Sequence, residues 1–216
     1  MDAREEKVLA LLQKAYPHAR IALNYKTPLD LLVATILSAQ CTDKTVNLVT
    51  APLFKKYRTP KDYAKADRKK LEREIRSTGF FRNKAKSIVN AAKAIIAEHH
   101  GKVPDSMEEL VKLPGVARKT ASVVLFNAFK KIEGITVDTH VIRLSQRLGL
   151  SKNTDPAKIE RDLMAIVPHP RWGKISYQLI EHGRKVCNAK KPLCPECLLK
   201  SVCPSRRFFI EKFYRG

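Results

Sequence analysis

Four of the five cysteines gather near the C-terminus with the spacing of metal ligands: Cys187, Cys194, Cys197 and Cys203 form the pattern C-x6-C-x2-C-x5-C. The N-terminal residues 1–13 are charged and contain no apolar run leading to a cleavage site, so neither secretion nor disulfides are expected. Four thiolates in a reducing compartment suit tetrahedral zinc or an iron–sulfur cluster. Zinc sites usually use two short pairs of ligands. Here only Cys194 and Cys197 are closely spaced, and the other loops are uneven, which favours an iron–sulfur cluster over a single zinc ion. The sequence shows no partner motif for electron transfer, so the expected role of the cluster is structural.

A lysine and an aspartate could act together on a sugar. Lys119 lies in the first turn of a predicted helix, where the helix dipole disfavours a cation. An uncharged amine there could attack C1′ of a sugar and form a Schiff base, although a simple phosphate contact, as for Arg118, is the alternative. Asp138 precedes an apolar-periodic segment, so it is also a candidate N-cap. The intervening chain is long enough to bring Asp138 back to Lys119.

The segment 113–119 predicts a tight turn between two helices. Pro114 ends the first helix, and Gly115 lets the backbone turn sharply. A turn of this kind presents free backbone N–H groups at a helix start, and such groups bind phosphate without reading bases. The alternative is an ordinary helix–helix corner.

The elements that must position these residues are predicted to be helices, because strand signals are almost absent. The segments 27–30 and 59–62 both read Thr-Pro-x-Asp, which is an N-cap, a proline at the first helical position and an acidic third residue. Residues 29–38 are apolar nearly all round, which predicts a buried helix. Residues 83–99 form a long amphipathic pattern. Short connections between such segments indicate an all-α fold.

The charge of the chain favours a polyanionic partner. Lys and Arg number 42 against 21 Asp and Glu, which gives a formal net charge of +21. The excess is spread along the chain, so it belongs to the folded surface, and nucleic acid is the first expectation. A lysine-rich surface of a heat-stable protein is the alternative, but stability would favour ion pairs of mixed sign. No apolar run reaches the length of a membrane span.

In chain order, these motifs resemble the endonuclease III family of the helix-hairpin-helix DNA glycosylases. The matching segments are 113–120, 137–140 and the cysteine pattern, and segments 38–43 and 79–85 fit as well. The resemblance therefore runs from residue 38 to residue 203 and covers almost the whole chain. Two features of this sequence depart from the family pattern. The second glycine of the hairpin is Ala117 here, which would carry strain of order 1 kcal/mol if a positive φ were required. Cys41, the fifth cysteine, is expected to be a small buried residue.

The resemblance implies an all-α fold of two helical domains with a DNA groove between them. One domain is a six-helix barrel over 23–132, with the helix-hairpin-helix near 106–130. The other joins 1–22 to 133–216 and holds a [4Fe-4S] cluster on Cys187, Cys194, Cys197 and Cys203. The expected partner is double-stranded DNA with a damaged base or an abasic site. We expect a cytoplasmic monomer that acts on the chromosome and has no membrane association.

The implied activity is base excision repair of oxidised or ring-fragmented pyrimidines, with AP lyase β-elimination through a lysine Schiff base. Lys119 is then the nucleophile and Asp138 the carboxylate that assists it. Gln40 and Phe80 would fill the space left by the flipped nucleotide, with ordinary packing at helix ends as their alternative. The further predicted DNA-binding residues are Leu113, Gly115, Ala117, Arg118, His140, Arg184, Lys190 and Lys191.

Two alternatives have distinct signatures. A monofunctional adenine or mismatched-thymine glycosylase of the same superfamily would lack the amine, and the adenine branch also expects a carboxylate in the first buried helix, where residues 31–37 have none. A non-catalytic DNA-binding module with a zinc or iron–sulfur loop would share the charge and the hairpin. That reading leaves the pairing of Lys119 with Asp138 unexplained.

Overall fold

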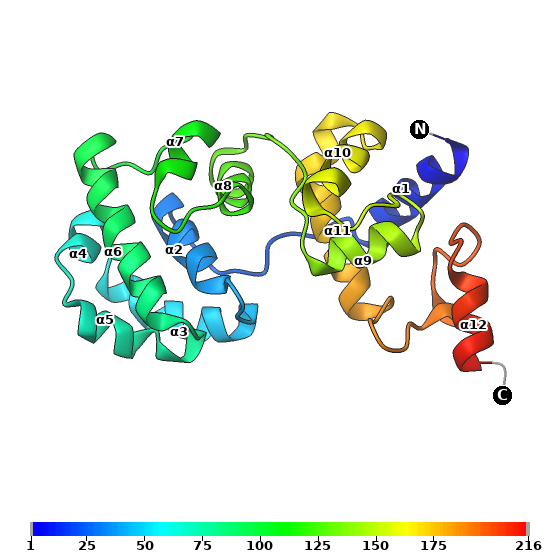
Figure 1. Ribbon diagram of the computed structural model, residues 1–216, viewed down its shortest axis with the longest axis horizontal. Helices are drawn as coiled ribbons and strands as arrows, with labels where there is room; N and C mark the ends of the chain where they lie inside the picture. Colours follow the sequence, from blue (N-terminus) through cyan, green and yellow to red (C-terminus); the bar gives the residue numbers. More distant parts are fainter. Residues whose placement is uncertain (1, 215–216) are drawn as a thin grey trace. The chain divides into compact units, whose positions relative to one another are not determined.

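Helices are the only regular secondary structure in the computed structural model, which describes residues 2–214 (Figure 1). The all-α prediction is confirmed. The chain divides into two compact units: unit 1 comprises Met1–Ile21 and Gly134–Gly216, and unit 2 comprises Ala22–Glu133. Over the described part of the chain, no helix combines the length and apolarity needed to cross a membrane.

Unit 2 is built around a buried helix. Its elements are α2 (Pro28–Ser38), α3 (Asp43–Lys56), α4 (Pro60–Ala64), α5 (Arg68–Glu74), η1 (Arg76–Thr78), α6 (Phe81–Glu98), α7 (Met107–Lys112), α8 (Arg118–Val124) and η2 (Leu125–Phe129). As its apolar sequence predicts, α2 is buried on nearly every side, and it packs against α3, α6 and α8 (Figure 1). The long helix α6 also contacts α4 and α5. The helices α3, α4, α5 and α8 therefore all pack on α2 or α6.

Local capping sets where two of these helices begin. Thr27 Oγ1 accepts from the backbone N–H of Asp30 at 3.1 Å, and the Asp30 carboxylate accepts from the N–H of Thr27 at 3.0 Å. Thr59 and Asp62 form the same reciprocal capping box at the start of α4. Each box satisfies N–H groups that have no partner inside the helix, which explains why Thr-Pro-x-Asp marks a helix start in this chain.

Unit 1 has its own apolar core. Its elements are α1 (Ala3–Ala15), α9 (Thr139–Arg147), α10 (Pro156–Ile166), η3 (His169–Arg171), α11 (Trp172–Lys185), η4 (Cys194–Glu196) and α12 (Arg206–Tyr214). The buried side chains come from α1, α9, α10 and α11 and include Val8, Leu9, Leu12, Val141, Leu144, Ile159, Leu163, Ile175 and Leu179. Leu199, in the cysteine loop, packs against the same core. The cysteine loop is thus attached to the helical core of unit 1.

The N-terminal helix α1 completes unit 1 from the far end of the chain. The Arg4 guanidinium donates to the carbonyl oxygens of Leu148 at 2.6 Å and Gly149 at 3.0 Å, just beyond α9. At the other end of α1, the Tyr16 hydroxyl lies 2.9 Å from His182 Nδ1 on α11. These bonds fasten the first residues of the chain to segments that follow unit 2.

Candidate functional site

The hairpin predicted at 113–119 is a tight turn between α7 and α8. The Val116 N–H donates to the Leu113 carbonyl at 3.1 Å, which closes a four-residue turn. Gly115, the third residue of that turn, has φ +81°, a left-handed conformation that glycine adopts without steric cost. Leu113 itself is buried, so a DNA contact at this position would come from its backbone.

The same glycine lies against the long helix α6. A Cβ atom built on Gly115 would lie 2.6 Å from Cβ and 2.8 Å from Oγ of Ser87. Ordinary carbon–carbon contacts are about 3.5–4.0 Å, so only glycine lets the turn approach α6 this closely. Both the backbone conformation and the packing therefore require glycine here.

Replacing Gly115 by alanine is expected to destabilise the protein by ~1–3 kcal/mol, the cost of holding a non-glycine residue in a sparsely populated backbone region. The melting temperature and the affinity for duplex DNA should both fall. Ala117→Gly is the matched control, because that position has an ordinary extended backbone and should change stability by only a few tenths of a kcal/mol. An unchanged melting temperature for Gly115→Ala would contradict the turn geometry described above.

Ala117 does not carry the strain that a positive φ would have imposed. It is the N-cap of α8 with φ −84° and ψ 166°, an extended conformation open to any residue. Its methyl group makes no capping hydrogen bond. The first N–H groups of α8 are therefore left without a side-chain cap, as a phosphate-binding helix start requires. Arg118 and Lys119, the first two residues of α8, have exposed side chains.

Asp138 is the N-cap of α9, the structural role that its position predicts. One carboxylate oxygen, Oδ1, accepts from the Val141 N–H at 2.8 Å. The side chain is half-buried. Since one oxygen suffices for the cap, the second can face a reacting group. Lys119 belongs to unit 2 and Asp138 to unit 1.

Gln40 and Phe80 share an unusual backbone conformation. Gln40 follows α2 with φ 53°, and Phe80 precedes α6 with φ 46°, after Gly79 with φ 69°. Both side chains are exposed, and that of Phe80 is 63% accessible. Cys41, next to Gln40, is half-exposed, so its expected burial was wrong: the residue sits in this exposed loop instead of the core.

The four C-terminal cysteines line a single cavity in unit 1. All four are free thiols, and Arg147, His182 and Phe209 complete much of the wall. Burial raises the pKa of the Cys197 thiol to about 11 and also raises the pKa values of Cys194 and Cys203. Within residues 2–214, no three His, Cys, Asp or Glu side chains are grouped so as to hold a metal ion. What brings the four cysteines together is the cavity that they share.

Two arginines that the sequence analysis missed hold the cysteine loop against α9. Arg147 donates to the carbonyl oxygens of Asn188 at 2.7 Å and Ala189 at 2.8 Å, and its Nη1 lies 3.4 Å from Cys187 Sγ. Arg143 donates to the Cys187 carbonyl at 3.2 Å. Their i,i+4 spacing in the helix that Asp138 opens was the available signal, since it places both on one helix face. The same helix thus carries Asp138 and anchors the loop.

His182 is a third residue to which the sequence analysis gave no role. It is buried between Tyr16 and Cys197, with Nε2 3.6 Å from Cys197 Sγ, and burial lowers its pKa to about 4. A histidine that stays neutral beside the thiols tightens the link between α11 and the loop. Its position five residues before Cys187 was the only sequence signal.

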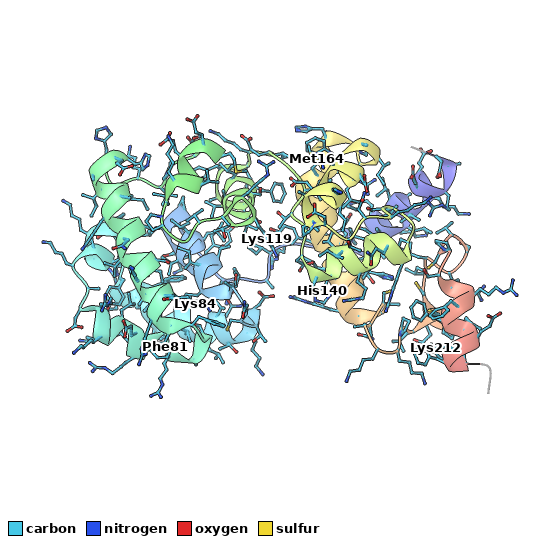
Figure 2. The ribbon with its side chains drawn as sticks, viewed as in Figure 1. Phe81, Lys84, Lys119, His140, Met164 and Lys212 are labelled. Carbon is cyan, nitrogen blue, oxygen red and sulfur yellow. The ribbon has the colours of Figure 1, made fainter. Side chains whose placement is uncertain are left out.

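The remaining predicted DNA-binding residues lie in unit 1. Nδ1 of His140, labelled in Figure 2, is 3.1 Å from the Arg143 guanidinium, so the ring packs on the surface of α9. Arg184, Lys190 and Lys191 are exposed. The Lys191 ammonium also lies 5.1 Å from the centre of the Tyr214 ring, which ties the loop to α12.

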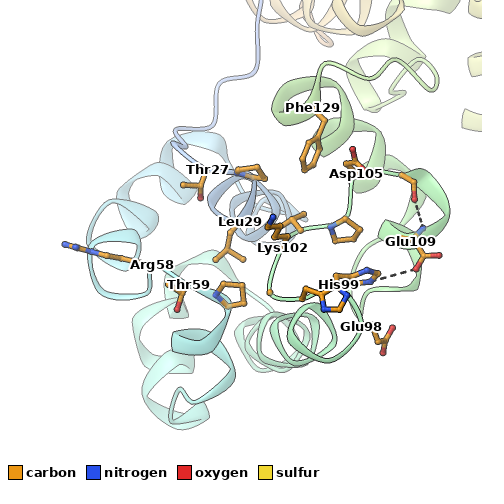
Figure 3. Close-up of a pocket in the computed structure, with 17 residues that line it drawn as sticks. Thr27, Leu29, Arg58, Thr59, Glu98, His99, Lys102, Asp105, Glu109 and Phe129 are labelled. Atoms are coloured by element: carbon orange, nitrogen blue, oxygen red, sulfur yellow. Dashed lines mark hydrogen bonds and ion pairs between the residues drawn. The ribbon is translucent and has the colours of Figure 1, made fainter.

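A separate cavity of about 730 Å³ opens in unit 2 (Figure 3). It lies among the first residues of α2 and α4 and the segment that follows α6. His99 Nε2 faces Glu109 Oε2 across 3.9 Å within it. Its wall contains none of the residues predicted to bind DNA or to react. This cavity is therefore no part of the predicted site.

Comparisons with known proteins agree with the geometry. Residues 33–169 match the model of the HhH-GPD superfamily base excision DNA repair proteins. The chain is 58% identical over 202 residues to an endonuclease III of Synechocystis sp., and the match covers 94% of this chain and 92% of that one. It is 47% identical over 189 residues to an endonuclease III of Bacillus subtilis, where the match covers 87% of this chain and 86% of that one. A solved structure of a trapped covalent intermediate between an endonuclease III and DNA superposes with a TM-score of 0.89 at 42% identity, over 96% of this chain and 99% of that one. The chain belongs to the endonuclease III family of the HhH-GPD superfamily of base excision DNA repair proteins.

Proposed function

We propose that this protein is a bifunctional DNA glycosylase and AP lyase that removes damaged bases from duplex DNA in base excision repair. Membership of the endonuclease III family supports the proposal, as does the likeness to an endonuclease III trapped in a covalent intermediate with DNA. The observation that carries it is the exposed amine of Lys119 in the first turn of α8, directly after the hairpin. Oxidised or ring-fragmented pyrimidines are the proposed lesions, and the cytoplasm, with access to the chromosome, is the proposed location.

Lys119 is the proposed nucleophile. Its neutral amine attacks C1′ of the damaged nucleotide, so that a C–N bond forms while the bond to the base breaks. The base leaves with the electron pair and takes up a proton. One proton then passes from the nitrogen to O4′ as the C1′–O4′ bond breaks and the sugar ring opens, which leaves a protonated Schiff base between Nζ and C1′. Removal of a C2′ proton then expels the 3′ phosphate, and water releases the amine.

Asp138 is the proposed assisting carboxylate. Positive charge develops on the sugar as the base departs, and a fixed carboxylate stabilises it or moves a proton. The N-cap bond to Val141 fixes the orientation of this carboxylate. The proposal requires that Lys119 of unit 2 and Asp138 of unit 1 act on the same sugar.

The DNA is held by its backbone, and the damaged nucleotide is flipped out, because C1′ chemistry is blocked inside the base stack. The uncapped N–H groups of α8 and the side chain of Arg118 are the proposed phosphate contacts in unit 2. Arg184, Lys190 and Lys191 supply further positive charge from unit 1. Gln40 and Phe80 fill the space that the flipped nucleotide leaves.

We assign a [4Fe-4S] cluster to the cavity that the four cysteines line, and unit 1 is then the cluster domain. Four thiols around one cavity are a suitable donor set, and the positive charge of iron would favour their thiolate forms despite burial. When bound, the cluster supplies cross-links that shape the loop 187–203 and present its lysines. Arg143 and Arg147 hold the same loop from α9 by hydrogen bonds to its carbonyl oxygens.

Removing one ligand is expected to remove the cluster. Cys203→Ser should abolish the bound iron and sulfide and the brown colour of the purified protein, because one hard hydroxyl replaces a thiolate that iron–sulfur clusters require. Cys41→Ser is the matched control, since this fifth cysteine lies outside the cavity, and its iron content should equal that of the wild type. A colourless wild-type protein that contains zinc would overturn the cluster assignment.

A panel of duplexes, each with one damaged base, tests the whole proposal when it is assayed with and without borohydride. A bifunctional enzyme releases the base, nicks the strand and becomes covalently joined to the DNA when the Schiff base is reduced. A monofunctional glycosylase would release the base and give no covalent adduct. A non-catalytic binding module would retard the duplexes and leave every base in place.

A further inference from the structure

The long helix α6 contains a buried lysine that neither the proposed chemistry nor the hairpin uses. Lys84 is 5% exposed, and its position on α6 is labelled in Figure 2. Lysine is almost never buried unless it is paired. Burial lowers the pKa of the Lys84 amine. Among residues 2–214, no carboxylate forms an ion pair with it, so its partners must be other groups.

The partners of this amine are two backbone carbonyl groups far apart in sequence. Nζ of Lys84 donates to the Leu37 oxygen at 2.8 Å and to the Thr78 oxygen at 2.7 Å. Leu37 lies in the last turn of α2, where carbonyl groups lack intrahelical donors and where the helix dipole favours a cation. Thr78 is the last residue of η1 and is itself buried. A single ammonium group therefore joins α6 to the ends of two other elements.

Each of these carbonyl groups lies shortly before a residue whose backbone is left-handed. Leu37 stands three residues before Gln40 (φ 53°), and Thr78 stands two residues before Phe80 (φ 46°). A non-glycine residue in this region is strained and persists only where its surroundings fix it. Both side chains are exposed, so their own packing does not fix them. The bonds from Lys84 hold the backbone three residues before Gln40 and two residues before Phe80.

We propose that Lys84 is a positioning residue that clamps the two loops bearing Gln40 and Phe80, so that both side chains enter the duplex as one unit. The inference rests on the proposed function, in which these two side chains fill the space of the flipped nucleotide. The two loops belong to separate elements, and Lys84 is a side chain whose hydrogen bonds reach the backbone leading to both. A shared donor fixes the spacing between the two loops before DNA binds. The conformational entropy lost in ordering them is then lost on folding and does not weaken DNA binding.

Lys84→Met is the first test, because it keeps the length and apolar stem of the side chain and removes the donor. Single-turnover excision of a damaged base from a duplex is expected to fall by at least roughly tenfold, within the ~100-fold loss that a misplacement of 1 Å can cause. Borohydride trapping on a preformed abasic site, where no base has to be extracted, should fall less than about threefold by the same argument. A merely structural role would lower both signals equally.

The coupling between Lys84 and the two loops provides a second test. In a Gln40→Ala, Phe80→Ala background, adding Lys84→Met should cost little further activity, because no inserting side chains remain to be positioned. Losses that multiply would show that Lys84 acts elsewhere and would overturn the inference. Lys93→Met, an exposed lysine on the same helix, is the matched control and should excise at the wild-type rate.

Folding of each variant is checked by circular dichroism and thermal unfolding. If Lys84→Met does not fold, Lys84→Gln replaces it in both tests, because its amide retains a donor; it should then excise at an intermediate rate. Wild-type excision by a folded variant overturns the inference alone, as does an equal fall in excision and trapping. A wild-type protein that excises no base overturns the proposed function and this inference together.

Discussion

Lys119→Ala is expected to abolish covalent trapping with borohydride and strand nicking, while duplex binding weakens only a few-fold. Without the primary amine no Schiff base can form, so the loss of trapping should be complete. Base release should fall by at least ~10³-fold, the scale on which positioned catalytic groups act. Reductive trapping on a labelled duplex, measured beside an equilibrium binding assay, separates a loss of catalysis from a loss of DNA binding.

Lys119→Arg is the control that keeps the charge. Arginine has no amine that can form a Schiff base, yet it preserves a cation at the start of α8. It should bind DNA as the wild type does and remain untrappable. A trapped adduct in either variant would place the nucleophile at another residue, and the assignment of Lys119 would then be wrong.

Asp138→Asn is expected to lower base excision by ~10²–10⁴-fold, the contribution of a positioned acid or base. Asparagine caps a helix as well as aspartate does, so α9 should keep its start and the melting temperature should hardly change. The exchange therefore removes the negative charge and leaves the cap. Single-turnover excision with thermal unfolding of the same preparation measures both effects.

The chain offers a matched control for this exchange. Asp155 is the N-cap of α10 in the same unit, and its carboxylate accepts from the Lys158 N–H at 2.9 Å, much as Asp138 accepts from Val141. Asp155→Asn should leave excision unchanged. If both variants retain full activity, capping is the whole role of Asp138, and the sugar's positive charge must be stabilised by another group.

The parts of the fold that were predictable from sequence are those governed by neighbours along the chain. The two Thr-Pro-x-Asp segments form capping boxes, and the apolar segment after Thr27 is a buried helix. The turn at Gly115 has the positive φ that its glycine suggested. The capping boxes and the turn depend on contacts within four residues, and the apolar pattern of the helix lies within its own segment, so a single sequence carries the necessary information.

The features that escaped prediction depend on contacts across long sequence separations. The buried amine of Lys84 reaches a carbonyl group 47 positions away, and Arg147 reaches the cysteine loop across 41 and 42 positions. In the sequence these residues look like ordinary surface cations. The backbone angle at Ala117 and the exposure of Cys41 also depend on how the helices pack, which no local pattern specifies.

The way α1 closes unit 1 has a consequence for synthesis on the ribosome. The apolar stripe of α1 is translated before unit 2, but the helices that cover it are translated only after the whole of unit 2. At ~5–20 residues per second, this delay is on the order of ten seconds. Unit 2 can fold as it emerges, whereas the nascent α1 needs shielding from aggregation until α11 arrives. The four cysteines at 187–203 are translated after unit 2 and after α1, α9, α10 and α11, so the proposed cluster can assemble only once those segments have been made.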